Sequence, residues 1–311
     1  MRITRLEDLE RYDCLYVAPD TAHAVLSCSG RIASETGRGL RVLVVSLFGP
    51  GPEDAAPPSA ACLGRIGVDF FQAGLPGARE RSTLYGSYVA CAFGREPGDD
   101  ACLDQAAHIL DGVARRIRAR HVYVPLAVGG HVDHRLAHEA AVRTFEPEAE
   151  RDVLLYEDRP AAFVPGAVRI RLAHLGARLP PAAPVAARSN LLRFLFRLQT
   201  APHLRPRLRG VGERLRCASH ALREWKAARA WDPRRALGLR LQPILQDGDT
   251  GGPAVLRDLL GDDARFGSHE RLAALAAQYA KGLGGGPNAE RYWLLLPSRD
   301  EGGLATLPSS A

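Results

Sequence analysis

Two short loops of this sequence carry aspartate and histidine side chains, the residue types from which metal sites and acid–base pairs are built. The first loop contains Asp20 and His23, and the second contains His131, Asp133 and His134. Zinc accepts both carboxylate and imidazole ligands, and a catalytic zinc site combines three protein ligands with one open position for water. Together the two loops outline one active site.

The elements that precede these loops explain how they meet. An apolar stretch at 14–18 leads into the first loop, a helix follows near 22–36, and a second apolar stretch at 121–125 leads into the other loop. In open α/β sheets, ligands bind beyond the carboxyl ends of the strands. Loops 18–23 and 126–134 are therefore expected to converge, although they lie far apart in the sequence.

Strands and helices alternate along the chain, which favours a parallel, doubly wound α/β sheet with right-handed crossovers. Strands are expected near 14–18, 40–48, 68–72, 121–125, 152–157 and 167–173. Helices are expected near 22–36, 55–66, 99–119 and 134–146. The helix at 99–119 is the clearest of these, because its apolar residues recur at helical spacing.

Several segments resemble the PIG-L/LmbE family of zinc-dependent N-deacetylases. The first family motif is Pro-His-Pro-Asp-Asp after strand one, and the second is His-x-Asp-His after a later strand. Other stretches that look like family segments are Gly74 to Tyr88, Leu154 to Ala162 and Ala289 to Trp293. The resemblance covers most of residues 10–175 and the end of the chain. It implies a Rossmann-like, LmbE-like α/β fold with a helical C-terminal extension.

The first motif departs from the family pattern. Ala24 to Gly30 looks like the family's Ala-Val-Leu-Gly-Cys-Gly-Gly, and this alignment puts Asp20 at the position of a zinc-ligand histidine. Ala22 then stands at the position of the general-base aspartate, and His23 at that of the second zinc ligand. The exchange keeps one carboxylate and two imidazoles when His134 is included. It would shift the metal, because an imidazole is longer than a carboxylate.

The second motif is intact. The resemblance puts His134 at the position of the third zinc ligand. His131 and Asp133 stand at the positions of the oxyanion-stabilising histidine and its partner, and they are the candidate catalytic residues. The family's substrate-facing loop corresponds to a segment with three candidate binding residues, Arg79, Arg81 and Tyr85.

Each loop also has an interpretation without catalysis. Asp20 is a good N-cap residue for the helix that follows it, and the metal site would then be retired. Asp133 would likewise cap the next helix, and Arg79 and Arg81 would be ordinary exposed arginines. With Ala22 in place of the base, a contribution of about 10²–10⁴-fold is lost unless another group, such as Asp133, takes the proton.

The family resemblance implies a metal-dependent hydrolase that removes an N-acyl group from an amino sugar or a sugar-bearing metabolite. Zinc would be the cofactor, and a small molecule of the amino-sugar type would be the binding partner. The alternative is a catalytically inactive PIG-L-like protein that keeps the fold for binding or regulation. Either interpretation is compatible with a homo-oligomer.

Composition narrows the class of protein. Hydrophobic residues make up 46% of the 311 residues and charged residues 24%, which are ordinary globular values. The first residues are charged, and no stretch approaches the ~20 apolar residues that span a membrane, so a cytoplasmic location is expected.

Six cysteines without a C-x-x-C pair indicate reduced core residues. Abundant Ala, Arg, Gly and Pro are typical of a GC-rich bacterial genome.

The chain changes character after residue 175. A segment rich in proline and alanine at 178–187 leads into a region expected to be rich in helix. We therefore divide the chain into an α/β domain at 1–175, a helix-rich extension at 176–300 that completes and covers the core, and a disordered tail at 301–311.

Charge is also segregated along the chain. Residues 188–240 contain fourteen Lys and Arg against three acidic residues, a local net charge of +11 within a total of +6. With an amphipathic helix expected at 191–198, this segment suggests an anion-binding module for nucleic acid, a membrane surface or an acidic protein. No nucleic-acid motif is present, however, and a solvated arginine face is the commoner explanation.

Overall fold

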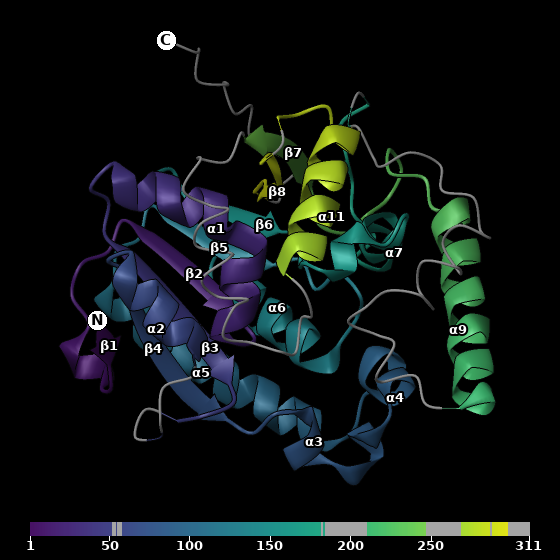
Figure 1. The fold of residues 1–311 in the computed structure, drawn as a ribbon, viewed down its shortest axis with the longest axis horizontal. Coiled ribbons are helices and arrows are strands. Elements are labelled where there is room, and N and C mark those ends of the chain that lie inside the picture. The colour runs from purple at the N-terminus through teal and green to yellow at the C-terminus, as the bar shows by residue number, and fades with distance from the viewer. Residues whose placement is uncertain are drawn as a thin grey trace.

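One sheet runs through the part of the chain that the computed structural model describes, which is residues 1–51, 54, 58–181, 183, 210–246, 269–286 and 288–297. Its strands are β1 (Arg2–Ile3), β2 (Cys14–Ala18), β3 (Val42–Phe48), β4 (Asp69–Leu75), β5 (His121–Pro125), β6 (Asp152–Tyr156), β7 (Leu241–Gln246) and β8 (Glu290–Leu295). They lie side by side in the order β1-β4-β3-β2-β5-β6-β8-β7 (Figure 1).

Strands β1 to β6 pair in parallel, as the alternation of strands and helices predicts. Strand β8 runs antiparallel to both of its neighbours, and Trp293 of β8 pairs with Leu155 of β6 and Pro243 of β7. The mostly parallel α/β sheet expected from the sequence is therefore confirmed.

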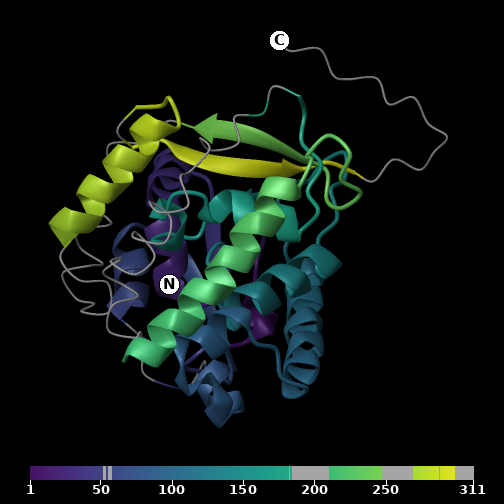
Figure 2. The same cartoon turned by 90° about the vertical axis from the view of Figure 1, so that its right-hand side faces the viewer.

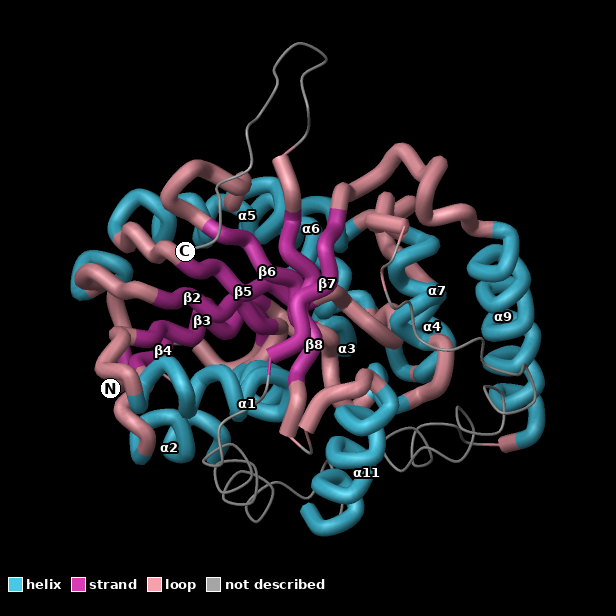
Figure 3. Tube along the Cα trace, turned by 90° about the horizontal axis from the view of Figure 1, so that it is seen from above, coloured by secondary structure: helices cyan, strands magenta, loops and turns pink. Residues whose placement is uncertain are grey.

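Helices cover both faces of the sheet. In chain order the α-helices are α1 (Thr21–Gly37), α2 (Pro58–Arg65), α3 (Ala78–Arg81), α4 (Tyr88–Phe93), α5 (Gly98–Arg116), α6 (Val132–Thr144), α7 (Ala167–His174), α9 (Val211–Ala230) and α11 (His269–Gly282). Short 3-10 turns occur at Leu6–Asp8, Thr83–Gly86 and Ala161–Phe163. Helices α1, α2 and α11 lie on one side of the sheet and α5 and α6 on the other (Figure 3).

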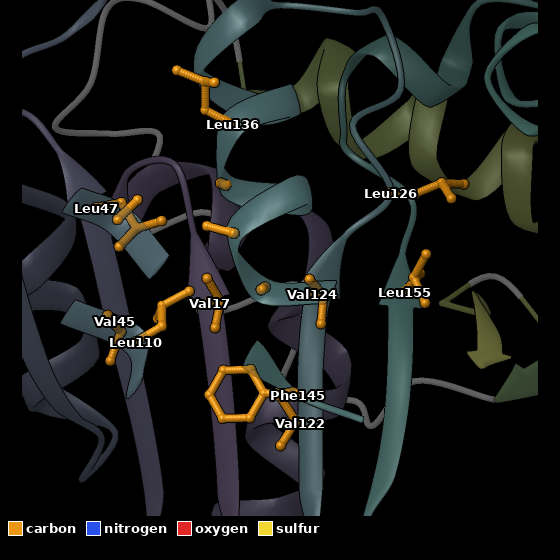
Figure 4. Packing of buried hydrophobic residues seen from close by; sticks show 14 of the residues in the cluster. Val17, Val45, Leu47, Leu110, Val122, Val124, Leu126, Leu136, Phe145 and Leu155 are labelled. Atoms are coloured by element: carbon orange, nitrogen blue, oxygen red, sulfur yellow. The ribbon is translucent and has the colours of Figure 1, made fainter. Parts of the chain in front are cut away.

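The core is divided into two layers by the strands, because successive side chains of a strand point to opposite faces. Figure 4 shows Val17, Val45 and Val124 on neighbouring strands, with their side chains in the layer beneath α5 and α6. Tyr16 and Val44 point the other way, into the layer beneath α1 and α2. Both faces are buried, which explains why these strands are continuous apolar runs.

One expected element is wrong. Residues 167–173 were expected to form a strand, and they form helix α7 instead. Gly166, with φ 91°, begins this helix, and its buried residues Val168, Arg171 and Leu172 recur at the spacing of a helix. The alternation of apolar and polar residues in this short segment fits either period, and the packing of one helical face decided between them.

The C-terminal region contributes both helix and strand. Helices α9 and α11 lie in the region expected to be rich in helix, while β7 and β8 extend the sheet of the α/β domain. Helix α9 packs against α4 and α7 (Figure 2). The division into an α/β domain and an extension remains a prediction. The expected amphipathic helix at 191–198 and the tail at 301–311 lie outside the described residues.

Helix α1 is kinked near its middle. Cys28 has non-helical backbone angles, with φ −128° and ψ 16°. Just beyond the kink, the amides of Gly30 and Arg31 each donate a hydrogen bond of 3.0 Å to the carboxylate of Glu290 on β8. A side chain from the end of the chain therefore satisfies donors that the kink would leave without partners.

The six cysteines are all described and all buried, as expected, and none of them forms a disulfide bond. In the part of the chain that the structure describes, no helix is both long enough and apolar enough to cross a membrane.

Candidate active site

A cavity of about 850 Å³ opens at the carboxyl ends of the parallel strands. Both loops singled out in the sequence reach its wall, and the five side chains concerned are Asp20, His23, His131, Asp133 and His134. The structure thus brings together residues from the ends of β2 and β5, which are neighbours in the sheet.

The turn after β5 gives the second loop its shape. Ala127 has φ 63°, a strained conformation for a residue with a side chain, and Gly129 and Gly130 also have positive φ. A Cβ atom on Gly130 would lie 2.7 Å from the carbonyl oxygen of Ala92. This close approach requires glycine and brings the start of α6 to the cavity. His131 is the N-cap of that helix, and its Nδ1 accepts a hydrogen bond from an amide of the first turn.

His134 is oriented by a carboxylate from the next strand. Its Nδ1 lies 2.6 Å from Oδ1 of Asp158, and Oδ2 of Asp158 accepts a hydrogen bond of 2.9 Å from the amide of Val128. Burial alone would lower the pKa of His134, but the hydrogen bond and charge of Asp158 outweigh it, so the pKa is raised. Because Asp158 engages Nδ1, the nitrogen left for other chemistry is Nε2.

Asp133 is held from two sides. Its Oδ1 forms an ion pair of 2.8 Å with Nη2 of Arg81, and its Oδ2 accepts a hydrogen bond of 3.2 Å from the amide of Ala78. Burial raises the pKa of Asp133 in spite of the nearby guanidinium. Nε of Arg81 also lies 2.9 Å from Oδ1 of the fully buried Asp99. The arginine thus bridges two carboxylates.

The three predicted substrate residues take different positions. Arg79 is exposed and lines the cavity. Arg81 lies behind the wall in its ion pairs with Asp99 and Asp133. Tyr85 is fully buried, and its hydroxyl contacts Asp99. The geometry places Arg79 where a ligand can touch it, and it places Arg81 and Tyr85 as supports for the second loop.

The first loop is organised locally. Asp20 is the N-cap of α1, and its Oδ1 accepts a hydrogen bond of 2.9 Å from the amide of His23. The same oxygen lies 2.9 Å from Nδ1 of His23. The rings of His23 and His134 meet edge to face with centroids 4.4 Å apart. The two loops therefore touch through their histidines.

The side chain at position 22 faces away from the cavity. Ala22 is fully buried within the apolar layer beneath α1, and it does not line the cavity. The cavity wall beside it is formed by Thr21, whose Oγ1 lies 2.5 Å from Oγ of Ser59. In the present backbone a longer side chain at position 22 would enter the core.

The donor types on this wall fit a divalent metal. One carboxylate and two imidazoles suit zinc, and a histidine whose second nitrogen meets a carboxylate is the usual form of a metal-binding histidine. Within the described residues, however, no three His, Cys, Asp or Glu side chains already surround one point. The contact between Asp20 and His23 uses Oδ1 of the carboxylate and Nδ1 of the ring.

Asp158 was not among the candidate residues of the sequence. It follows β6, the strand beside β5, and stands in the stretch Leu154 to Ala162 that looks like a family segment. The carboxyl end of the next parallel strand was therefore the signal that could have found it.

Comparison with solved structures agrees with this architecture. The zinc-inhibited form of teicoplanin deacetylase Orf2 superposes with a TM-score of 0.55 at 17% sequence identity, covering 93% of this chain and 99% of the other. A complex of the teicoplanin pathway deacetylase with teicoplanin gives 0.54 at 17% identity, covering 92% and 99%. The A40926 pseudoaglycone deacetylase Dbv21 gives 0.51 at 17% identity, covering 94% and 100%.

No protein-family model matches the sequence, and no curated protein sequence matches it either. The similarity is thus one of structure at low sequence identity, over nearly the whole of each chain. It shows that this chain has the fold of these deacetylases.

Proposed function

We propose that this protein is a metal-dependent hydrolase that removes an N-acyl group from an amino sugar or a sugar-bearing metabolite. One observation carries the proposal. His134 is held by Asp158 on the wall of a cavity that Asp20, His23 and His131 also line. The shared fold supports the same reaction class, because the similar structures are named as deacetylases.

Asp20, His23 and His134 are the proposed ligands of a divalent metal, with zinc as the expected ion. Such an ion, when bound, polarises an acyl carbonyl and lowers the pKa of bound water. Asp158 fixes the tautomer and orientation of the His134 ring through its contact with Nδ1. The contact between Asp20 and His23 is expected to compete with the metal, which lowers its affinity.

His131 and Asp133 have separate tasks in this proposal. His131 stands at the helix start with Nδ1 accepting a backbone hydrogen bond, so Nε2 is the nitrogen that can donate to a developing oxyanion. Both carboxylate oxygens of Asp133 are engaged, by Arg81 and by the amide of Ala78. Asp133 therefore orients the loop, and serving as a base would require it to leave one of these contacts.

The proposed activity is weak on generic N-acetyl sugars. General-base assistance is typically worth about 10²–10⁴-fold, and no carboxylate stands at Ala22. The substrate itself, or Asp133 after it leaves one of its contacts, has to supply the missing proton acceptor.

Metal content and acetate release together test the proposal. Untagged protein is equilibrated with zinc, and bound metal is measured by elemental analysis beside His134→Ala. The matched control is His108→Ala, because His108 is an exposed histidine on α5. We expect bound zinc in the native protein and the control, loss of zinc in His134→Ala, and slow acetate release from N-acetylglucosamine glycosides.

Two results would contradict the proposal. If the native protein holds no zinc and releases no acetate, the chain is a binding protein that has kept the fold. If His134→Ala holds as much zinc as His108→Ala, the metal site lies elsewhere.

A further inference from the structure

The cavity has a second region between α4, α7 and α9 that the proposed chemistry does not use. Its apolar wall includes Tyr88, Ala92, Val164 and Ile170. Arg171 on α7 and Arg135 on α6 are among the arginines that line the cavity.

Arg171 is a buried cation, and no carboxylate among the described residues forms an ion pair with it. Its side chain lies on the cavity wall, although only 8% of the residue is exposed. Nε donates a hydrogen bond of 2.7 Å to the carbonyl oxygen of Leu126. In the described part of the chain its terminal nitrogens make no hydrogen bond or ion pair. Burial lowers the pKa of Arg171 to about 10, so the guanidinium is still charged near neutral pH.

Arg135 adds a second, partly satisfied cation. It follows His134 in α6, and its Nη2 donates a hydrogen bond to the carbonyl oxygen of Gly94. Its Nε is buried and has no partner among the described residues. The side chains of Arg135 and Arg171 both belong to the lining of the same cavity.

The acidic residues whose charges reach Arg171 are already engaged. Asp158 accepts hydrogen bonds from Val128 and from the ring of His134. Glu139 accepts two hydrogen bonds from Arg95, of 3.0 and 2.9 Å. The nearby carboxylates therefore reduce the positive potential at the cavity wall, but neither forms an ion pair with Arg171. A buried charge without a partner is costly, and a bound anion would remove that cost.

We infer that Arg171 and Arg135 form a subsite for a carboxylate group on the substrate. A guanidinium matches a carboxylate with two parallel hydrogen bonds, and the apolar wall strengthens that attraction because it excludes water. A single negative charge suits the subsite better than a dianion, since Asp158 and Glu139 lie nearby. The inference rests on the proposed function for the identity of the rest of the ligand, and it narrows the substrates to acidic amino sugars.

Two ligands that differ by a single negative charge test this inference separately from the proposed function. N-acetylmuramic acid and its methyl ester differ only in the carboxylate, and their binding can be measured by calorimetry with a chelator present. We expect the acid to bind at least about tenfold more tightly than the ester. Added salt should weaken the acid and leave the ester unchanged, because only the acid is charged.

Variants assign the preference to the subsite. Arg171→Met should abolish the difference between acid and ester, and Arg171→Lys should keep part of it. Arg118→Met removes an exposed arginine elsewhere and should leave the preference intact. Arg171 also holds the Leu126 carbonyl, so Arg135→Gln provides a second test if Arg171→Met does not fold.

The outcomes separate this inference from the proposed function. Equal binding of acid and ester, or no binding of either at millimolar concentration, overturns the subsite whatever the hydrolysis assay shows. A preference that survives in both Arg171→Met and Arg135→Gln overturns it as well. A preference for the acid without any acetate release upholds the subsite and refutes the hydrolase.

Discussion

The two loops at the cavity differ in how their side chains are held. In the loop before α1, Asp20 caps its own helix and contacts His23 three residues along the chain. In the first turn of α6, which continues the second loop, Asp158 from the end of β6 holds His134, and Arg81 from α3 holds Asp133. The first group is ordered by its own sequence, and the second by two separate elements, the end of β6 and helix α3.

This difference indicates where the structure maintains a fixed geometry. A contact within one helical turn forms wherever the helix forms, and it constrains little beyond itself. A buried carboxylate aimed at a ring nitrogen from another strand fixes the ring in one position. The second loop is therefore the more firmly held half of the site, and the first loop is the half that would rearrange if the proposed metal binds.

The largest effect is expected from Arg81→Met. This change leaves Asp99 and Asp133 buried without their shared cation, and loss of one partner in a buried ion pair costs about 3–5 kcal/mol. Urea unfolding measures the cost. Arg79→Met, two residues away on the cavity wall, should change stability by less than about 0.5 kcal/mol. If the two variants lost equal stability, the ion pairs of Arg81 with Asp99 and Asp133 would not be supporting the second loop.

A smaller loss is expected from Asp158→Ala. The ring of His134 and the amide of Val128 would both lose a buried acceptor, which costs about 2–3 kcal/mol. Asp158→Asn should recover part of this loss, because its amide oxygen can still accept one hydrogen bond. Urea unfolding of both variants checks the order. If alanine and asparagine were equally harmless, Asp158 would not be orienting the histidine.

A still smaller loss is expected from Asp20→Ala. Removal of an N-cap side chain costs about 1 kcal/mol, and Asp20→Asn should cost less because asparagine caps helices well. Thermal unfolding in the presence of a chelator separates this cost from any effect of metal. A loss larger than that of Asp158→Ala would reverse the comparison between the loops.

The smallest effect concerns acid stability. Burial alone would raise the pKa of Asp99, but hydrogen bonds from Tyr85, the Glu96 amide and Arg81 outweigh it, so the pKa is lowered. Asp99 therefore contributes stability that is present above its unfolded pKa of about 3.9 and is lost as the pH falls through its folded value. Unfolding of Asp99→Asn and the native protein should differ less at low pH than near neutrality. A constant difference would contradict this assignment.

The sequence predicted most of the fold because its central strands are apolar runs between clear helices. It failed at 167–173, where a short segment fits both periods and only packing of one face selects the helix. It also predicted that Asp20, His23 and His134 lie near one another, because parallel strands bring their carboxyl ends to one edge of the sheet.

The supports of the site were harder to predict. Asp158 meets His134 across 24 residues, and the Ala78 amide meets Asp133 across 55. Such contacts depend on the packing of separate elements, which residue spacing does not contain. Arg81 illustrates the problem, since its type and position suggested a substrate contact while its burial gives it a supporting place between carboxylates.

The kink in α1 has a consequence for how the chain folds during its synthesis on the ribosome. The amides of Gly30 and Arg31 obtain their acceptor from Glu290, which is translated about 260 residues after them. During synthesis, these two amides can bond only to water until β8 has been made and has entered the sheet between β6 and β7. Completion of the helix that begins at Thr21 thus depends on a strand that is made about 260 residues later.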